Sequence, residues 1–381
     1  MTAAAVVRAR AAPVPDIRFM EGAIALGRRM MGRTWPNPAV GALIVRHELH
    51  GPVIVGRGWT RAGGRPHAET EALRRAGEAA RGATLYVTLE PCSHHGQTPP
   101  CADAIIAAGI SRVVYAVGDP NPLVAGAGHA RLRAAGIAVD VGLGATEARR
   151  SLAGHLCRMR HARPHVMLKL AVSADGKIGL AGRRPVAITG PEIQARVHLL
   201  RAASDAVMIG SGTALADDPQ LTCRLPGMAD RSPVRIVLDR ELRVPLTSKL
   251  VQTIGTAPVW LVASTDASRE REAALRERGV QILRAETGPG GLSLPRVLAL
   301  LAARGMTRLM VEGGARLAAA LVAADLVDEF VVSRAPKLLG PDGVDAIEGL
   351  PLSILTHSPR FASRGVEALG EDTIETFDRV D

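Results

Sequence analysis

PHAETEAL (residues 66–73) and TLYVTLEPC (residues 84–92) are the two stretches that decide the fold of this chain. The first opens on a proline and continues with helix-forming residues, so it predicts a helix with His67 and Glu69 in its first turn. The second is apolar and rich in β-branched residues, and it predicts a buried strand whose end carries Cys92. A helix followed by a buried strand indicates an α/β sheet.

Three side chains in and after these stretches are of types that bind zinc: His67, Cys92 and Cys101. Two prolines precede Cys101 and predict that it begins a second helix, where the helix dipole favours a thiolate. A structural zinc normally has four protein ligands, whereas a catalytic zinc keeps one position for water. Glu69 is an acid two residues from His67, so the two side chains diverge in a helical turn. One zinc per chain with three protein ligands, and Glu69 as the catalytic proton shuttle, is the arrangement of a zinc deaminase.

Taken singly, these residues have simpler interpretations. A histidine at a helix start is usually a capping or surface residue, and a buried cysteine usually packs as a small hydrophobic side chain. The joint arrangement is far more specific than its members. Eight residues separate the two cysteines, whereas the general deaminase signature has two. We therefore interpret the polar segment 93–100 as a candidate substrate-recognition loop beside the metal.

Length and cysteine content indicate two domains in a reducing compartment. The chain has 381 residues, which is long for one domain and suits two. Its four cysteines show no paired spacing, so we expect a cytoplasmic location. No apolar stretch is long enough for a secretory signal or a membrane span, so we expect no membrane partner.

Positive charge raises the alternative of nucleic-acid binding. The formal net charge is +10, and clustered lysines and arginines neutralise phosphates. In this chain the arginines are dispersed and aromatic residues make up only 2%, without a basic run that alternates with stacking side chains. We therefore expect no nucleic-acid partner, and we interpret the charge as suited to small phosphorylated ligands.

Five short motifs carry a resemblance to a known family. They are PNPAVG (36–41), TLEPCSHHG (88–96), TPPC (98–101), DPNP (119–122) and VAG (124–126). Together they resemble the bifunctional deaminase/reductase family of riboflavin biosynthesis, and the resemblance continues through the second half of the chain. It implies zinc-dependent hydrolytic deamination of 2,5-diamino-6-(5-phosphoribosylamino)pyrimidin-4(3H)-one, followed by NADPH-dependent reduction of the ribosyl group to ribityl phosphate. It also implies a homo-oligomer, either a dimer or a tetramer.

The resemblance implies an α/β chain with two folds in series. The first is a cytidine-deaminase-like three-layer α/β/α domain, and the second is a dihydrofolate-reductase-like α/β domain. We place a flexible tail over residues 1–16, the deaminase domain over 17–148, a linker over 149–163 and the reductase domain over 164–381. We see no helical pattern in the basic linker segment.

Local patterns predict some elements of the first domain. Apolar residues at helical spacing predict a helix over residues 19–31, and a second helix follows over 129–135. Segments of high β-branched content predict strands over 40–45 and 112–117.

A phosphate site is predicted in the second domain. Residues 309–312 form a short apolar strand, and two glycines at 313–314 precede a helix whose free N-terminal amides suit a pyrophosphate. A plain turn between a strand and a helix is the alternative. The sequence Gly-Ser-Gly at 210–212 lacks a third glycine, so it is only weak evidence for a dinucleotide fingerprint.

The resemblance assigns further contacts by position. It implies NADPH contacts at Ala171, Thr213, Asp217, Gly314, Ala315, Arg316, Leu317, Ala318, Ala319 and Ala320. It implies substrate contacts at Asn37 and His94 in the deaminase, and at Arg201, Leu221, Arg224 and Glu312 in the reductase. The two arginines suit a phosphate because a guanidinium group is a planar cationic fork.

Some positions depart from the family pattern or leave alternatives open. Ala187 stands where relatives commonly have a tryptophan, and Gln97 stands where they often have lysine or arginine, for which Arg65 is a candidate replacement. Lys169 either polarises the ribose oxygen or is merely solvated. Arg240 either meets a cofactor 2′-phosphate or is an exposed turn arginine.

The sequence is also compatible with two other functions. One is a nucleoside or tRNA deaminase joined to an unrelated oxidoreductase. The other is a zinc-stabilised binding protein without catalysis, in which His94 or His95 supplies a fourth ligand.

Overall fold

The computed structural model describes residues 14–380 except 95, 97–98, 181–185 and 289. Contacts divide the described residues into two compact units, of which the first lies within residues 14–30 and 37–156 and the second within residues 31–36 and 157–380. Most of the predicted tail, residues 1–13, lies outside the described residues. In the described part, no helix has both the length and the apolar character that a membrane crossing requires.

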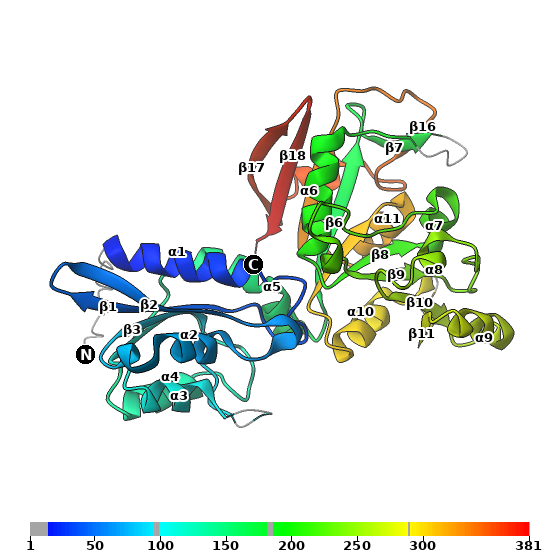
Figure 1. The fold of residues 1–381 in the computed structure, drawn as a ribbon. Coiled ribbons are helices and arrows are strands. Elements are labelled where there is room, and N and C mark those ends of the chain that lie inside the picture. Colours follow the sequence, from blue (N-terminus) through cyan, green and yellow to red (C-terminus); the bar gives the residue numbers. More distant parts are fainter. Residues whose placement is uncertain (1–13, 95, 97–98, 181–185, 289, 381) are drawn as a thin grey trace, which may run out of the picture. The chain divides into compact units, whose positions relative to one another are not determined.

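The first unit is a five-stranded sheet with helices on both faces (Figure 1). Its strand order is β2-β1-β3-β4-β5; β1 is antiparallel to β2 and β3, whereas β3, β4 and β5 are parallel. The strands are β1 (Gly41–Glu48), β2 (Gly51–Trp59), β3 (Thr84–Leu89), β4 (Arg112–Val117) and β5 (Ala138–Val141). The helices are α1 (Val14–Arg28), α2 (Ala68–Ala76), α3 (Cys101–Ala107), α4 (Ala127–Ala134) and α5 (Ala145–His161), with short 3-10 helices η1 (Ala62–Gly64) and η2 (Gly77–Ala80). Helix α1 lies on one face, and α2, α3 and α4 lie on the other (Figure 1).

Glycines allow two of these helices to lie directly on the sheet. A Cβ at Gly41 would lie 1.9 Å from the carbonyl oxygen of Ala23 in α1, and a Cβ at Gly58 would lie 1.9 Å from that of Ala68 in α2. Gly58 pairs with Ala42, the neighbour of Gly41 in β1. Because successive residues of a strand face opposite sides, the two glycines serve opposite helix layers.

The second unit is built on a nine-stranded sheet of order β11-β10-β9-β8-β14-β6-β15-β18-β17. Strands from β11 to β15 in this order are parallel, and β18 and β17 add an antiparallel hairpin. The strands are β6 (His165–Val172), β8 (Ala206–Gly210), β9 (Val234–Leu238), β10 (Val259–Ser264), β11 (Gln281–Ala285), β14 (Arg308–Glu312), β15 (Glu329–Arg334), β17 (Phe361–Leu369) and β18 (Asp372–Arg379). Two small sheets pair β7 (Lys177–Leu180) with β16 (Gly343–Asp345), and β12 (Thr287–Gly288) with β13 (Gly291–Leu292). The helices are α6 (Pro191–Ala202), α7 (Ser211–Asp217), α8 (Lys249–Gln252), α9 (Arg269–Glu277), α10 (Leu294–Ala303), α11 (Ala315–Ala323) and α12 (Ser353–Thr356), with the 3-10 helix η4 (Ala229–Arg231).

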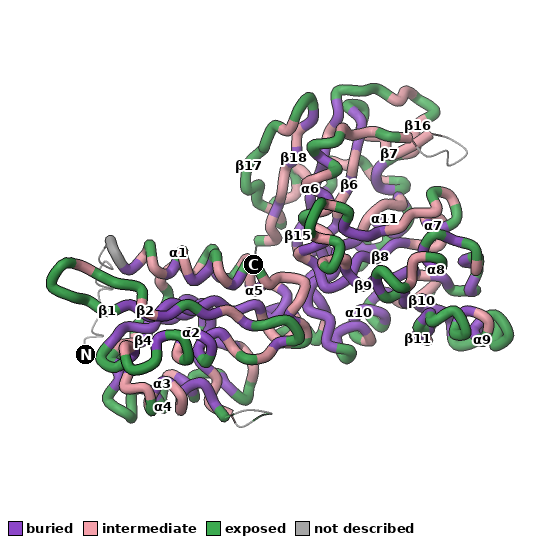
Figure 2. Tube along the Cα trace, viewed as in Figure 1, coloured by how far each residue is buried: buried purple, intermediate pink, exposed green. Residues whose placement is uncertain are grey.

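Both faces of the large sheet are buried over its parallel part (Figure 2). In β8, Ala206 and Met208 belong to one hydrophobic cluster, whereas Val207 and Ile209 belong to another. Alternate residues therefore enter separate cores, as expected for a parallel sheet covered on both sides. The edge strand β17 differs, because its seven central residues are exposed (Figure 2).

The structure confirms some predicted elements and corrects others. Strand 112–117 coincides with β4, and strand 40–45 lies within β1 apart from its first residue. The helix predicted over 19–31 is α1, which begins at Val14 and ends at Arg28. The helix predicted over 129–135 is α4, which begins at Ala127 and ends at Ala134.

Helix α5 covers most of residues 149–163, where we expected no helical pattern. The apolar spacing that we missed is Ala148, Leu152 and Leu156, which recur every four residues and are buried in the core of the first unit. The boundary between the two units falls inside this helix, between residues 156 and 157.

The close contact of α2 with the sheet should contribute to the stability of the first unit. Gly58→Ala places a methyl group against the backbone of Ala68, so we expect the free energy of unfolding of the first unit to fall by about 1 to 3 kcal/mol. Chemical denaturation monitors this loss. Gly255→Ala is the matched control, because a Cβ there meets no atom within 4 Å. Equal stability of the two variants would contradict the close contact.

Candidate active sites

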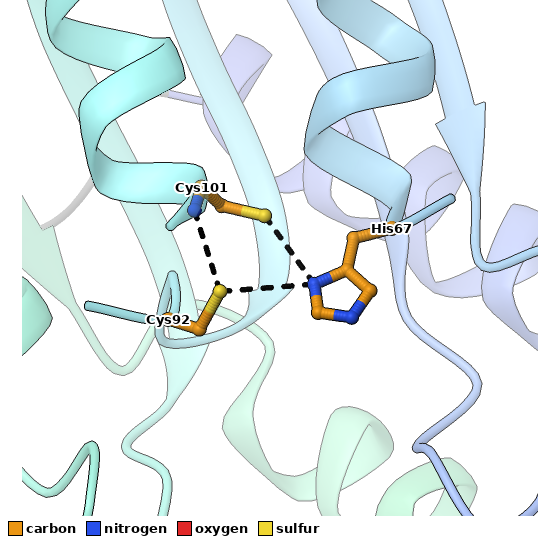
Figure 3. A group of neighbouring side chains, drawn as sticks. All are labelled: His67, Cys92 and Cys101. Atoms are coloured by element: carbon orange, nitrogen blue, oxygen red, sulfur yellow. Dashed lines mark hydrogen bonds between the residues drawn. The ribbon is translucent and has the colours of Figure 1, made fainter. Parts of the chain in front are cut away.

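The first candidate site lies where β3 ends and α2 and α3 begin (Figure 3). His67, Cys92 and Cys101 each offer a ligand atom there, and these atoms lie within 4.8 Å of one another. His67 Nδ1 is 3.7 Å from Cys92 Sγ and 3.4 Å from Cys101 Sγ. One imidazole nitrogen and two cysteine sulfurs at this spacing are a donor set that suits zinc. In the described part of the chain, this group has three members.

The local backbone geometry positions these three ligand side chains close to one another. His67 is the N-cap of α2 and has extended dihedral angles, φ −68° and ψ 160°. Our expectation that it lies within the first helical turn is therefore wrong by one position, because the N-cap residue has non-helical angles. Cys101 is the first residue of α3. Its amide donates to Cys92 Sγ at 3.3 Å, and the amide of Ala102 donates to Cys92 O at 3.1 Å.

The three ligand groups shift one another's pKa values. Hydrogen bonds with Cys101 and then His67 lower the pKa of Cys92 to about 4. The hydrogen bond with Cys92 raises the pKa of Cys101 and of His67 above their ordinary values. The lowered pKa of Cys92 favours its thiolate form. The thiolate is the form of cysteine that binds a metal.

Glu69 lies in the first turn of α2 and is only 4% exposed. Burial raises its pKa to about 7, although the neighbouring His67 acts in the opposite direction. It is not a member of the three-residue ligand group. A buried carboxyl group with this pKa can take up and release a proton near neutral pH. The site therefore combines a zinc-type donor set with an acid and base that is not a ligand.

Other residues predicted for this site lie nearby. Asn37 Nδ2 donates to the carbonyl of Gly64, three residues before His67, at 3.3 Å. His94 follows Cys92 by two residues, and its Nδ1 is buried without a hydrogen-bond partner among the described residues. A Cβ built on Gly96 would lie 3.5 Å from Arg65 Nη2, so the guanidinium of Arg65 lies beside this loop. His95 and Gln97 lie outside the described residues.

The second candidate site is a cavity of about 1080 Å³ in the second unit. It opens at the carboxyl ends of β6, β8, β9 and β14, which is where open parallel sheets bind ligands. The predicted residues that line it are Ala171, Thr213, Asp217, Gly314, Ala315, Arg316, Leu317, Ala320, Arg201, Leu221, Arg224 and Glu312. Ala318 and Ala319 do not line it; Ala318 is fully buried and Ala319 packs against the same core.

The cavity also shows where the residues lie for which the sequence left more than one interpretation. Lys169 and Ala187 both line it, so Lys169 faces the cavity and not bulk solvent. Arg240 lines the cavity too, but its side chain is 55% exposed and forms an ion pair with Glu241. Arg243 was not among the predicted residues, but it lines the same cavity and donates to Ser211 Oγ at 2.8 Å. No motif marks Arg243, because its contact joins residues 32 positions apart.

A bidentate ion pair organises the cavity. Arg201 Nε and Nη2 donate to the two carboxylate oxygens of Glu312 at 2.5 and 2.7 Å, and Arg201 Nη1 donates to Thr222 O at 3.1 Å. Both side chains of the pair are nearly buried, at 11% and 12% exposure. Burial lowers the pKa of Lys169, and the negative charge of Glu312 opposes this shift. Lys169, Arg201 and Arg224 are three cationic side chains of the cavity. They lie near a single carboxylate, that of Glu312, and this excess of positive charge favours an anionic ligand.

The helix α11 begins beside this group. Gly313 and Gly314 both have positive φ, 68° and 80°, and they connect β14 to α11. A Cβ on Gly314 would lie 3.0 Å from Thr213 Oγ1. The glycines therefore fit a tight turn and leave the N-terminal amides of α11 next to the cavity, where a phosphate can approach them.

Two family models match the chain. The cytidine and deoxycytidylate deaminase zinc-binding region matches residues 14–117, and the RibD C-terminal domain matches residues 164–374. The predicted order of folds, a cytidine-deaminase-like domain followed by a reductase domain, is confirmed.

Relatives match over almost the full chain. The riboflavin biosynthesis protein RibD of Aquifex aeolicus (strain VF5) is 42% identical, over 96% of this chain and 98% of that protein. RibD of Escherichia coli (strain K12) is also 42% identical, over 94% and 97% of the two chains.

Solved structures agree with this match. Acinetobacter baumannii RibD, form 1, is similar with a TM-score of 0.84 and 37% identity, covering 96% of this chain and 99% of that one. The diaminohydroxyphosphoribosylaminopyrimidine deaminase/5-amino-6-(5-phosphoribosylamino)uracil reductase of Thermotoga maritima has a TM-score of 0.81 and 33% identity, with the same coverage. The chain therefore belongs to the RibD family of riboflavin biosynthesis proteins.

Proposed function

We propose that this chain is a bifunctional enzyme of riboflavin biosynthesis. The first domain removes an amino group from 2,5-diamino-6-(5-phosphoribosylamino)pyrimidin-4(3H)-one by zinc-dependent hydrolysis. The second domain reduces the ribosyl group to ribityl phosphate with NADPH. The main support for the proposal is the group of three zinc-type ligands in the first domain. Glu69 lies beside this group and is a buried acid that does not belong to it.

In the deaminase, His67, Cys92 and Cys101 hold the zinc ion. A zinc ion held by these residues would supply Lewis acidity, which brings the pKa of water toward neutrality. Glu69 would take a proton from the attacking water and give it to the ring nitrogen. It would then carry the hydroxyl proton of the adduct to the amine, which leaves as ammonia. Its pKa of about 7 suits both transfers. Asn37 and His94 contact the pyrimidine substrate.

In the reductase, different residues of the cavity bind the cofactor and the substrate. The N-terminus of α11, with Gly314 to Leu317 and Ala320 at the cavity, would hold the pyrophosphate of NADPH, and Ala171, Thr213 and Asp217 would contact the same cofactor. Arg201, Leu221, Arg224 and Glu312 contact the phosphoribosyl substrate. NADPH supplies the hydride that reduces the ribose carbon. Lys169 lies inside the cavity, which supports the interpretation that it polarises the ribose oxygen.

We further propose a cytoplasmic homo-oligomer. All four cysteines are unpaired, as expected in a reducing compartment. Strand β17 ends the large sheet with an exposed edge, and such edges commonly pair or are covered in the assembled protein.

Loss of one ligand should remove the metal. In Cys101→Ala, two ligands remain, and we expect purified protein to lose its one zinc per chain, measured by elemental analysis. Cys223→Ala is the matched control, because Cys223 is equally buried but belongs to the second unit. Full zinc content in Cys101→Ala would contradict the assigned ligand set.

Replacement of the acid should separate metal binding from deamination. We expect Glu69→Gln to retain zinc and to release ammonia about 10² to 10⁴ times more slowly, since it lacks the proton shuttle. The variant should still reduce a substrate that is already deaminated. Loss of zinc from Glu69→Gln would instead indicate that Glu69 is a ligand. Turnover of tRNA or cytidine by the wild-type protein, without turnover of the phosphoribosyl pyrimidine, would contradict the proposed substrate.

The ion pair of Arg201 and Glu312 should contribute to substrate binding in the reductase. In Glu312→Gln one charged acceptor of Arg201 is lost, and a hydrogen bond to a charged group is worth about 1.5 to 3 kcal/mol. We expect the KM for the phosphoribosyl substrate to rise about tenfold or more, with deamination unchanged. The exposed Glu277→Gln serves as the control. NADPH oxidation at varied substrate concentration measures the effect, and an unchanged KM would remove Glu312 and Arg201 from the substrate site.

A further inference from the structure

Glu90 is a buried carboxylate that the proposed mechanism leaves unused. It lies between the end of β3 and the ligand Cys92 and is 4% exposed. No lysine or arginine of the described ranges forms an ion pair with it. Its carboxylate instead accepts three backbone N–H bonds, from Asp119 at 3.3 Å, Gly126 at 3.2 Å and His129 at 3.1 Å.

Two of these three donors belong to the start of helix α4. Gly126 is the N-cap of α4 with a left-handed φ of 78°, and it has no side chain to cap the helix. His129 lies in the first turn. Glu90 therefore supplies, from a different element, the acceptor that an N-cap side chain normally supplies. A negative charge at a helix N-terminus is also favoured by the helix dipole.

The helix capped in this way packs on the peptide that precedes Cys92. A Cβ at Gly128 would lie 2.0 Å from the carbonyl oxygen of Pro91, so α4 lies directly against this peptide. The amide of Glu90 donates to Val117 O in β4 at 2.9 Å. On the other side, Cys92 O accepts from the first turn of α3. The short segment from Glu90 to Cys92 is thus held from three directions.

We propose that Glu90 is a positioning residue of the zinc site. By capping α4 it fixes the Pro91 peptide, and it thereby sets where Cys92 Sγ lies relative to His67 Nδ1 and Cys101. Both oxygens of the carboxylate accept N–H bonds, so a glutamine would turn its amide nitrogen toward a donor. The inference rests on the zinc ligands of the proposed function, but it does not depend on the substrate.

The test uses Glu90→Gln in the full-length, zinc-loaded protein. We expect zinc to transfer to a chromogenic chelator about 10 to 100 times faster than from wild type, as found when the groups that orient metal ligands are changed. We expect the kcat of deamination to fall and its KM to stay near the wild-type value, because Glu90 does not touch the substrate. The reductase activity of the same chain should be unchanged, which excludes general unfolding. Glu78→Gln, an exposed glutamate of η2 in the same unit, should behave as wild type.

A second variant tests the same contact with Glu90 intact. Gly128→Ala pushes α4 away from the Pro91 carbonyl, and we expect it to speed zinc loss as well. If Glu90→Gln does not fold, this variant decides the question. Zinc loss at the wild-type rate in either folded variant would overturn the proposal. Faster zinc loss in a protein whose wild type does not deaminate the phosphoribosyl pyrimidine would uphold the role of Glu90 and refute the proposed function.

Discussion

The deaminase half depends on where one buried strand ends. Every residue of β3 is buried, and the strand pairs with β1 on one side and β4 on the other. Its end is therefore fixed, and Cys92 follows it within three residues. The starts of α2 and α3 bring His67 and Cys101 to the same point from separate parts of the sequence (Figure 3). A metal site made from one strand end and two helix starts needs little further ordering when the ion binds, because rigid elements position all three ligands.

In the second unit too, the ends of rigid elements position the site residues, but the residues are of a different chemical type. Carboxyl ends of parallel strands meet at one edge of the large sheet and line a single cavity with side chains and glycine-rich turns. Charge decides what that cavity can hold. The pair of Arg201 and Glu312 keeps a guanidinium group in a fixed orientation, and the nearby Lys169 and Arg224 leave an excess of positive charge. An anionic substrate and a phosphorylated cofactor both suit this environment.

Local sequence points to residues that the structure brings together at the first candidate site. His67, Cys92 and Cys101 lie within 4.8 Å of one another, and they stand at helix starts and strand ends, which have short, recognisable patterns. The exact cap position of His67 was missed, since the boundary of a helix depends on tertiary packing. Helix α5 was missed for a related reason, because its basic surface residues concealed the spacing of its few buried positions.

Contacts between distant residues were not predictable from the chain alone. Arg201 and Glu312 are 111 residues apart, and Glu90 and His129 are 39 apart. No local pattern reports such pairs, so the organisation of the reductase cavity and the cap of α4 became evident only in three dimensions. Of the fourteen reductase positions that the family resemblance implies, twelve line the cavity, whereas Ala318 and Ala319 lie away from it.

X-ray absorption at the zinc edge of the purified protein distinguishes a catalytic zinc ion from a structural one. For a catalytic ion we expect one nitrogen and two sulfur ligands from the protein, together with one oxygen that exchanges with solvent. A second nitrogen in place of that oxygen would mean that the ion is closed by an imidazole and is structural. That result would contradict a hydrolytic role for the first domain.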